Sequence, residues 1–201
     1  MKRILPLLLA SFLLLPGCGD DDGGPRTKGT VVCVGDSLTA GIHCIGASYP
    51  TRLAAMSGRP VVNLGVGGAT TRDGPARVQK AFSYNPGVIC ILYGSTDPGH
   101  HLSLEASLAN IRAMASACKA RGIPAILGTP PPTMKPHQNR NDRLAEMSAG
   151  IKAIAKEMGF QVVDLNAAIG ANREKYLNPD DGLHFSDAGG DLVAKKFDSK
   201  L

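Results

Sequence analysis

The sequence contains no tryptophan, and aromatic residues make up only 4% of its 201 positions. A broad aromatic platform, of the kind that binds extended polysaccharides or stacks nucleic-acid bases, is therefore hard to build. The formal net charge is +5, but the lysines and arginines are scattered and form no run that would follow a phosphate backbone. We therefore expect no nucleic-acid partner.

The chain also lacks an apolar run long enough to cross a bilayer as a stable helix. Its most apolar segment, residues 4–15, is short and follows Lys2 and Arg3. A positive start followed by a short apolar core is typical of a signal peptide. The next residues, Leu15-Pro16-Gly17-Cys18, resemble a bacterial lipobox, although Pro16 is an unusual occupant of its position.

We expect residues 1–17 to be a signal peptide, with cleavage before Cys18 and acylation of its thiol. A plain signal peptide with a cleavage site nearby is the alternative. Residues 18–29 are rich in Gly and Asp and offer nothing apolar to bury after Cys18, so they predict a flexible tether. The lipid on Cys18 would hold a domain at residues 30–201 on the periplasmic side of a bacterial membrane or at the cell surface.

Metal ligands and disulfides are weakly indicated. The aspartates at 20–22 match no metal-binding spacing, so we predict no metal site. Four cysteines remain besides Cys18, and an even number in an exported domain permits disulfides. They are Cys33, Cys44, Cys90 and Cys118. Two of them lie in apolar runs, where cysteine is commonly a small buried hydrophobic residue, so no pairing is predicted.

Apolar runs alternate with helical patterns along residues 30–201. The runs are short and nearly continuous, which is typical of parallel strands covered on both faces. They lie at residues 30–34, 61–64, 88–93, 125–127 and 161–163. The clearest helical patterns lie at 102–121, with Ser103 as a possible N-cap, at 140–158, followed by Gly159, and at 186–197. This alternation predicts one three-layer α/β/α domain with a parallel sheet.

Four polar or glycine-rich segments follow predicted strands. They read GDSLT at 35–39, NLGVGGAT at 63–70, GSTD at 94–97 and DGLH at 181–184. Because ligands bind at the carboxyl ends of the strands in such sheets, we expect the four segments to meet at one rim.

Together these segments contain the parts of a serine hydrolase. A serine hydroxyl such as that of Ser37 needs a base to take its proton, and His184 can be that base. Asp181 can accept the other ring N–H and fix the tautomer. The backbone N–H groups of Ser37 and Gly68 are candidate donors to an oxyanion. No metal or organic cofactor is needed.

Each residue alone has a simpler interpretation. Ser37 could be a helix N-cap, Asp181 a turn residue, and His184 a surface or buried core histidine. Asp180 is a rival to Asp181, but only Asp181 lies three residues before His184. Their joint order favours the catalytic interpretation.

In this order the four segments resemble the four sequence blocks of the SGNH, or GDSL, hydrolase family, over essentially all of residues 30–200. The resemblance implies a flavodoxin-like domain with a five-stranded parallel sheet, no cofactor, and esterase or lipase activity. It also implies that Ser37 is the nucleophile, that Gly68 is an oxyanion donor, and that Asp181 and His184 complete the triad.

One block departs from the family pattern. The third block normally supplies an Asn side chain as a further oxyanion donor, and this chain has Thr96 there. A Thr hydroxyl is a shorter donor that can instead bond nearby groups, so its assignment as an oxyanion donor is doubtful. We expect Asp36 and Asp97 to hold their loops by hydrogen bonds.

The expected substrate is a small acyl ester, such as a short acyl ester, a lysophospholipid, a thioester or an O-acetyl sugar, and we expect a monomer. The Thr96 change motivates an alternative, a weakened or inactive envelope protein that binds an acyl or sugar ligand. A flavodoxin-like cofactor binder is a third possibility, but it leaves the DGLH segment unexplained. His43 and Cys44 follow the nucleophile loop and either line the pocket or pack. His100 and His101 lack a third ligand for a metal.

Overall fold

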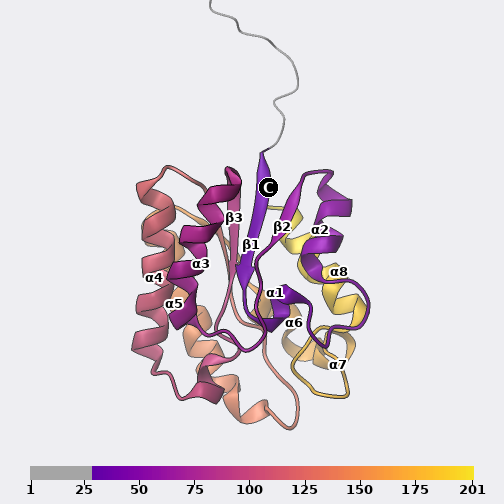
Figure 1. Ribbon diagram of the computed structural model, residues 1–201. Coiled ribbons are helices and arrows are strands. Elements are labelled where there is room, and N and C mark those ends of the chain that lie inside the picture. The colour runs from indigo at the N-terminus through magenta and orange to yellow at the C-terminus, as the bar shows by residue number, and fades with distance from the viewer. Residues whose placement is uncertain (1–28) are drawn as a thin grey trace, which may run out of the picture.

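A computed structural model describes residues 29–201 as a parallel sheet between two layers of helices (Figure 1). The sheet has five strands in the order β2-β1-β3-β4-β5, and all pairings are parallel. The strands are β1 Thr30–Gly35, β2 Val61–Asn63, β3 Pro86–Leu92, β4 Ala125–Gly128 and β5 Gln161–Val163. This confirms the predicted fold. The predictions for the signal peptide, Cys18 and the tether up to residue 28 lie outside the described residues.

One layer of helices covers each face of the sheet (Figure 1). On one face lie α3 Gly74–Ala81, α4 Leu104–Ala120 and α5 Asn141–Met158; on the other lie α2 Tyr49–Ser57, α6 Leu165–Ile169 and α8 Asp187–Asp198. Two single-turn helices, α1 Ser37–Ala40 and α7 Arg173–Tyr176, belong to the rim. Short 3-10 turns are η1 Thr71–Asp73, η2 Phe82–Tyr84, η3 Asp97–His100, η4 Gln138–Arg140 and η5 Gly170–Asn172.

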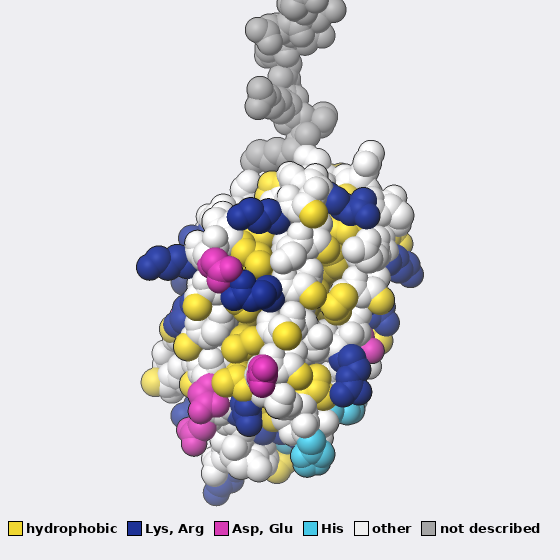
Figure 2. Space-filling view, turned by 90° about the vertical axis from the view of Figure 1, so that its left-hand side faces the viewer, with side chains coloured by type: hydrophobic (Ala, Val, Ile, Leu, Met, Phe, Trp, Pro, Cys, Tyr) yellow, Lys and Arg dark blue, Asp and Glu magenta, His cyan; other side chains and the backbone are white. Residues whose placement is uncertain are grey.

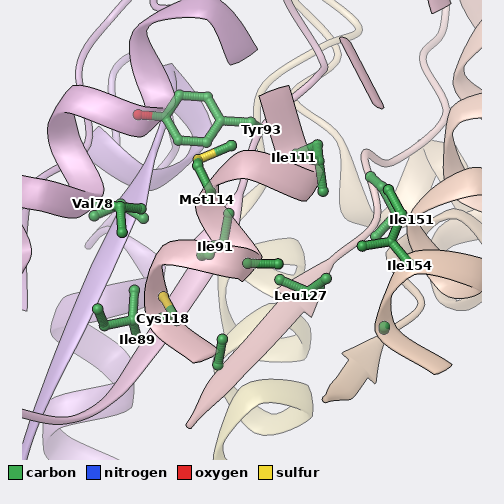
Figure 3. Close-up of a cluster of buried hydrophobic side chains, with 14 of the residues drawn as sticks. Val78, Ile89, Ile91, Tyr93, Ile111, Met114, Cys118, Leu127, Ile151 and Ile154 are labelled. Carbon is green, nitrogen blue, oxygen red and sulfur yellow. The ribbon is translucent and has the colours of Figure 1, made fainter. Parts of the chain in front are cut away.

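Both faces of the central strands are apolar, because successive side chains of a strand point to opposite faces. Val32 and Ile89 pack under α3, α4 and α5 in the cluster shown in Figure 3, whereas Val31 and Val88 pack under α2 and α8. Val31, Val32 and Ile89 are fully buried. Burial of such side chains stabilises the fold by roughly 1.5–3 kcal/mol each.

Local signals fix where the long helices begin and end. The side chain of Ser103 accepts a hydrogen bond from the Ala106 N–H at 3.1 Å, so it caps α4 as predicted. Gly159 ends α5 in the left-handed conformation, with φ of 74°. The strand β3 begins earlier than predicted, at Pro86, because this residue pairs with Thr30 at the start of β1.

Within residues 29–201, Cys33, Cys44, Cys90 and Cys118 form no disulfide with one another. Among residues 29–201, no helix combines the length and the apolar character needed to span a bilayer.

Candidate active site

The nucleophile loop is shaped by the turn that leads from β1 into α1. Gly35 has no room for a side chain, because a Cβ atom there would lie 2.4 Å from the carbonyl oxygen of Leu92. Asp36 then caps α1, since its Oδ1 accepts a hydrogen bond from the Leu38 N–H at 2.9 Å. The N-cap is therefore Asp36 and not Ser37, which leaves the Ser37 hydroxyl available to face another segment.

The structure brings Ser37, His184 and Asp181 into one chain of hydrogen bonds. Ser37 Oγ lies 2.9 Å from His184 Nε2, although the two residues are 147 positions apart in the sequence. His184 Nδ1 lies 2.8 Å from Asp181 Oδ2. Only 6% of Ser37 and 8% of His184 is exposed, so bulk water competes weakly for these bonds. The spacing fits a hydroxyl, a base and an orienting carboxylate.

Asp181 is held in its ionised form by its surroundings. Partial burial raises the pKa of its carboxyl, but the hydrogen bonds from the backbone N–H groups of His184 and Leu183 and from the His184 ring outweigh burial and lower the pKa. Asp180 is exposed, and its backbone N–H donates to Asn178 Oδ1. Of the two aspartates considered from the sequence, Asp181 is the one that contacts His184.

The second block lies beside the nucleophile. Gly68 has φ of 73°, and the position of its missing Cβ faces open space. Within residues 29–201, neither the Gly68 N–H nor the Ser37 N–H donates to a protein acceptor. Asn63 ties this loop to α1, because its amide Nδ2 donates to the Thr39 carbonyl at 2.9 Å. The N–H groups of Ser37 and Gly68 are therefore both left without a protein acceptor among these residues, and the bond from Asn63 holds the second block against α1.

The polar side chains of the third block form hydrogen bonds to neighbouring parts of the protein. The Thr96 hydroxyl donates to the Ala69 carbonyl at 2.6 Å. Asp97 is 2% exposed and accepts hydrogen bonds from the backbone and hydroxyl of Thr71 and from the hydroxyl of Ser107. The expectation that Asp97 holds its loop agrees with these bonds. Thr96 likewise braces the loop that carries Gly68.

Asp36 differs from Asp97 because it is fully buried and, among residues 29–201, only one of its carboxylate oxygens is hydrogen-bonded. Burial raises the pKa of Asp36 to about 7. The Leu38 N–H opposes this rise, and the negative charge of Asp97 adds to it. Burial therefore favours the protonated form of Asp36 at pH values where an exposed aspartate is ionised.

Residues 41–48 form a loop that contacts the segment containing His184. The His43 and His184 ring centroids are 5.2 Å apart, and the Asn178 side chain donates to the His43 carbonyl at 2.9 Å. The Ile45 N–H donates to the Phe185 carbonyl at 3.1 Å. His43 thus lies at the site, one of the two placements considered from the sequence. No motif marked Asn178, which lay in a cluster of turn residues.

The histidine side chains visible in Figure 2 gather at the end of the molecule where the strands finish. Within residues 29–201, however, no three His, Cys, Asp or Glu side chains are grouped to hold a metal ion. The arrangement at Ser37 is instead suited to acyl transfer by acid–base chemistry of the side chains.

Comparison with known proteins identifies the family of the chain. The model of the GDSL-like lipase/acylhydrolase family matches residues 33–192. An isoamyl acetate-hydrolyzing esterase 1 homolog from Bos taurus is 29% identical, with 85% of this chain and 80% of that protein covered. An acetylxylan esterase from Xylanibacter ruminicola is 27% identical over 82% of this chain, which spans only 41% of that longer protein.

Solved structures show the same fold. The structure of a lipolytic protein assigned to the G-D-S-L family from Desulfitobacterium hafniense DCB-2 superposes with a TM-score of 0.75 at 27% identity, covering 86% of this chain and 99% of that one. A lipase/acylhydrolase from Enterococcus faecalis gives a TM-score of 0.73 at 24% identity, covering 85% and 94%. The chain therefore belongs to the GDSL-like lipase/acylhydrolase family and is a hydrolase of ester bonds.

Proposed function

We propose that Ser37 is the nucleophile of a serine esterase, with His184 as the general base and Asp181 as the residue that orients it. The observation that carries this proposal is the chain of two short hydrogen bonds from Ser37 Oγ through the His184 ring to Asp181. With Asp181 accepting from Nδ1–H, Nε2 is left to accept the serine proton.

In the first step, Ser37 Oγ attacks the carbonyl carbon of the ester, and its proton passes to His184 Nε2. The tetrahedral intermediate then collapses with cleavage of the bond to the alcohol oxygen, which takes the proton from Nε2. Water attacks the acyl-enzyme in the second step, again giving a proton to His184, and the acid leaves as Ser37 recovers its hydrogen.

The oxyanion of both intermediates would be bound by the backbone N–H groups of Ser37 and Gly68. Thr96 is not a third donor in this proposal, because its hydroxyl proton lies in the bond to the Ala69 carbonyl. Loss of one such donor costs about 10²–10³ in kcat in a well-studied protease, so we expect slower turnover than a three-donor site gives.

The proposed substrates are esters of short acyl groups. Both curated relatives described above carry names that refer to acetate esters, isoamyl acetate and acetylated xylan. Few aromatic side chains are available for a long polysaccharide platform. We therefore favour small acetyl or short acyl esters over polymeric substrates, and we place lysophospholipids and thioesters second.

Labelling with a fluorophosphonate tests the nucleophile, because only an activated serine reacts with it. We expect labelling of the wild-type protein and of Ser83→Ala, a control at an exposed serine. Ser37→Ala should give none. Absence of labelling in a folded wild-type protein would instead support the alternative of an inactive envelope protein.

A p-nitrophenyl ester series from acetyl to dodecanoyl, measured on the wild type and Ser37→Ala, tests the substrate class. We expect kcat/KM to be highest for the acetyl to butyryl esters and to be lost in Ser37→Ala. A maximum at long chains would reject the short-acyl proposal while leaving the nucleophile assignment intact.

We also propose that Cys18 is the site of lipid attachment and that the protein is held in the bacterial envelope. The support is the order of positive residues, apolar run and lipobox-like sequence before position 18. Growth of an expressing bacterium with an alkyne-tagged palmitate should label the wild type in the membrane fraction. Cys18→Ser should lose the label, and labelling that survives this change would reject Cys18 as the site.

A further inference from the structure

A basic cleft of about 700 Å³ opens beside the candidate active site. One wall is formed by η3 and the residues that follow it, and the other by residues 136–143. Its lining contains two histidines and two arginines but no aspartate or glutamate; these four are His101, His137, Arg140 and Arg143. The cleft therefore has the electrostatic character of an anion site.

Both walls connect directly to the catalytic segments. The wall containing η3 begins immediately after Thr96 in the third block. The other wall follows residue Met134, whose backbone N–H donates to the Gly182 carbonyl at 2.8 Å, between Asp181 and His184. A Cβ atom at Gly182 would lie 2.5 Å from the Lys135 carbonyl oxygen, so the two segments are in close contact. The walls of the cleft thus adjoin the segments that contain Thr96 and Asp181.

Arg140 carries the strongest argument. It is half-buried, and within residues 29–201 its side chain forms no ion pair or hydrogen bond. Its guanidinium lies against Gly99, where a Cβ atom would be 3.1 Å from the nearest terminal nitrogen. By contrast, Arg52 pairs with Asp187 and Asp191. A partly desolvated guanidinium without an acceptor is well suited to a carboxylate or phosphate, which it can bind through two parallel hydrogen bonds.

The other basic groups support the same conclusion. Arg143 has only a long contact of 3.9 Å with Glu146, which does not line the cleft. Burial and the charge of Arg140 lower the pKa of His137, whereas Asp181 raises it and His184 lowers it. With its pKa lowered, His137 lines the cleft as a largely uncharged ring at neutral pH, so the fixed positive charge of the cleft comes from Arg140 and Arg143.

We propose that this cleft is a subsite for an anionic group, a carboxylate or phosphate, carried by the ester substrate, with Arg140 as the residue that binds it. This inference rests on the proposed function, because it assigns the preferred substrate of the same serine. The anionic group can belong either to the alcohol or to the acyl part, and matched esters distinguish the two.

The first pair of esters, 4-acetoxybenzoate and its neutral methyl ester, places the charge on the alcohol. The second, p-nitrophenyl monoglutarate and p-nitrophenyl valerate, places it on the acyl group. We expect kcat/KM to be roughly tenfold higher for the charged member of one pair, as a charge-assisted hydrogen bond gives. Arg140→Gln should abolish this preference and leave the neutral ester within about twofold of the wild type.

Arg112→Gln is the matched control, since it removes the same charge from an exposed ion pair on α4 and should keep the preference. Equal rates for the charged and neutral members of both pairs in the wild type would overturn the inference. So would an equal fall of both members in Arg140→Gln. If neutral esters are still hydrolysed, either result leaves the proposed function standing.

A binding measurement keeps the test independent of catalysis. In Ser37→Ala, 4-hydroxybenzoate or glutarate should raise the melting temperature, whereas methyl 4-hydroxybenzoate should not. The double variant Ser37→Ala/Arg140→Gln should lose the shift. If the wild type proves inactive, an Arg140-dependent shift would still support the anion subsite, and the lack of any shift would reject it.

Discussion

The two sides of the candidate active site use their polar groups differently. On one side, the first and last blocks direct Ser37, His184 and Asp181 at each other, and their bonds form a path along which a proton can move. On the other side, the side chains of Thr96 and Asp97 in the third block form hydrogen bonds that hold neighbouring loops and helices in place. The first side is built for proton transfer and the second for support.

This difference explains how the chain can depart from the family in one block and still belong to it. The proton path needs three particular side chains in a fixed order, and all three are present. In the proposed mechanism, oxyanion binding draws on backbone N–H groups as well, so we expect the replacement of one Asn by Thr96 to weaken it without removing it. The predictions below test each side, beginning with the largest expected effect.

Asp181→Asn should break the proton path. The Asn oxygen can keep the bonds to the backbone N–H groups of Leu183 and His184, but its NH₂ group would then face His184 Nδ1. The ring would carry its proton on Nε2 and could not accept the proton of Ser37. We expect kcat for p-nitrophenyl acetate to fall about 10³–10⁴-fold with the fold intact. Asp180→Asn is the matched control, and an equal fall there would contradict the assignment.

Asp36 should make stability depend on pH. The unfolded chain loses this proton near the ordinary pKa of 3.8 and the folded chain near 7, so the folded state binds more protons between these values. The free energy of unfolding should therefore fall as pH rises through this window, by on the order of 4 kcal/mol from this group. Asp36→Asn should be more stable than the wild type at pH 8 and similar below pH 4. Urea unfolding checks this, and parallel pH curves for the two proteins would contradict it.

Asp97→Ala tests the supporting role of the third block, and we expect it to lower stability. The substitution leaves the backbone and hydroxyl donors of Thr71 and the hydroxyl of Ser107 without their acceptor. We expect the free energy of unfolding to fall by about 3 kcal/mol, because a buried donor without an acceptor costs roughly 1–3 kcal/mol. Ser107→Ala removes one donor and should cost about 1 kcal/mol. If Asp97→Ala lowers the free energy of unfolding by less than about 1 kcal/mol, the network of hydrogen bonds around Asp97 contributes little to stability.

Thr96→Asn should restore part of the missing oxyanion stabilisation. An Asn amide carries two N–H donors, so one can hold the Ala69 carbonyl while the other faces the reacting oxygen. We expect kcat for p-nitrophenyl acetate to rise about tenfold, a fraction of what a full donor contributes. Thr96→Val has no hydroxyl to donate to the Ala69 carbonyl, so it should lower the free energy of unfolding and change kcat only slightly. A clear fall in rate for Thr96→Asn with the fold intact would count against this interpretation.

Much of the fold could be predicted because its signals are local. The apolar runs, the Ser103 cap and the Gly159 helix end depend on residues close together in the chain, and the structure shows all of them where expected. The sequence did not predict every strand end and helix cap. The strand β3 begins at Pro86, earlier than predicted, because of its pairing with Thr30. The cap of α1 was assigned from the sequence to Ser37 as an alternative, and the structure gives it to Asp36.

The sequence indicated the candidate site residues but not the groups that surround them. The departure from the family pattern at Thr96 is visible in the sequence. Its hydrogen-bond partner Ala69 lies 27 positions away and could not be predicted from the sequence. Nothing local marks Arg140 as unpaired, or His43 as the neighbour of His184. Such features depend on which loops the sheet brings together.

The sequence by itself determined the parallel α/β fold and the family, because strand and helix signals and the four blocks are written in short stretches of chain. Only the tertiary structure decided which polar groups have partners: that the Thr96 hydroxyl is engaged, that one oxygen of Asp36 is buried without a partner in the described part of the chain, and that Arg140 faces an open cleft. Hydrogen bonds and desolvation depend on distances of a few ångströms between segments far apart in the chain, and these distances exist only once the sheet has formed.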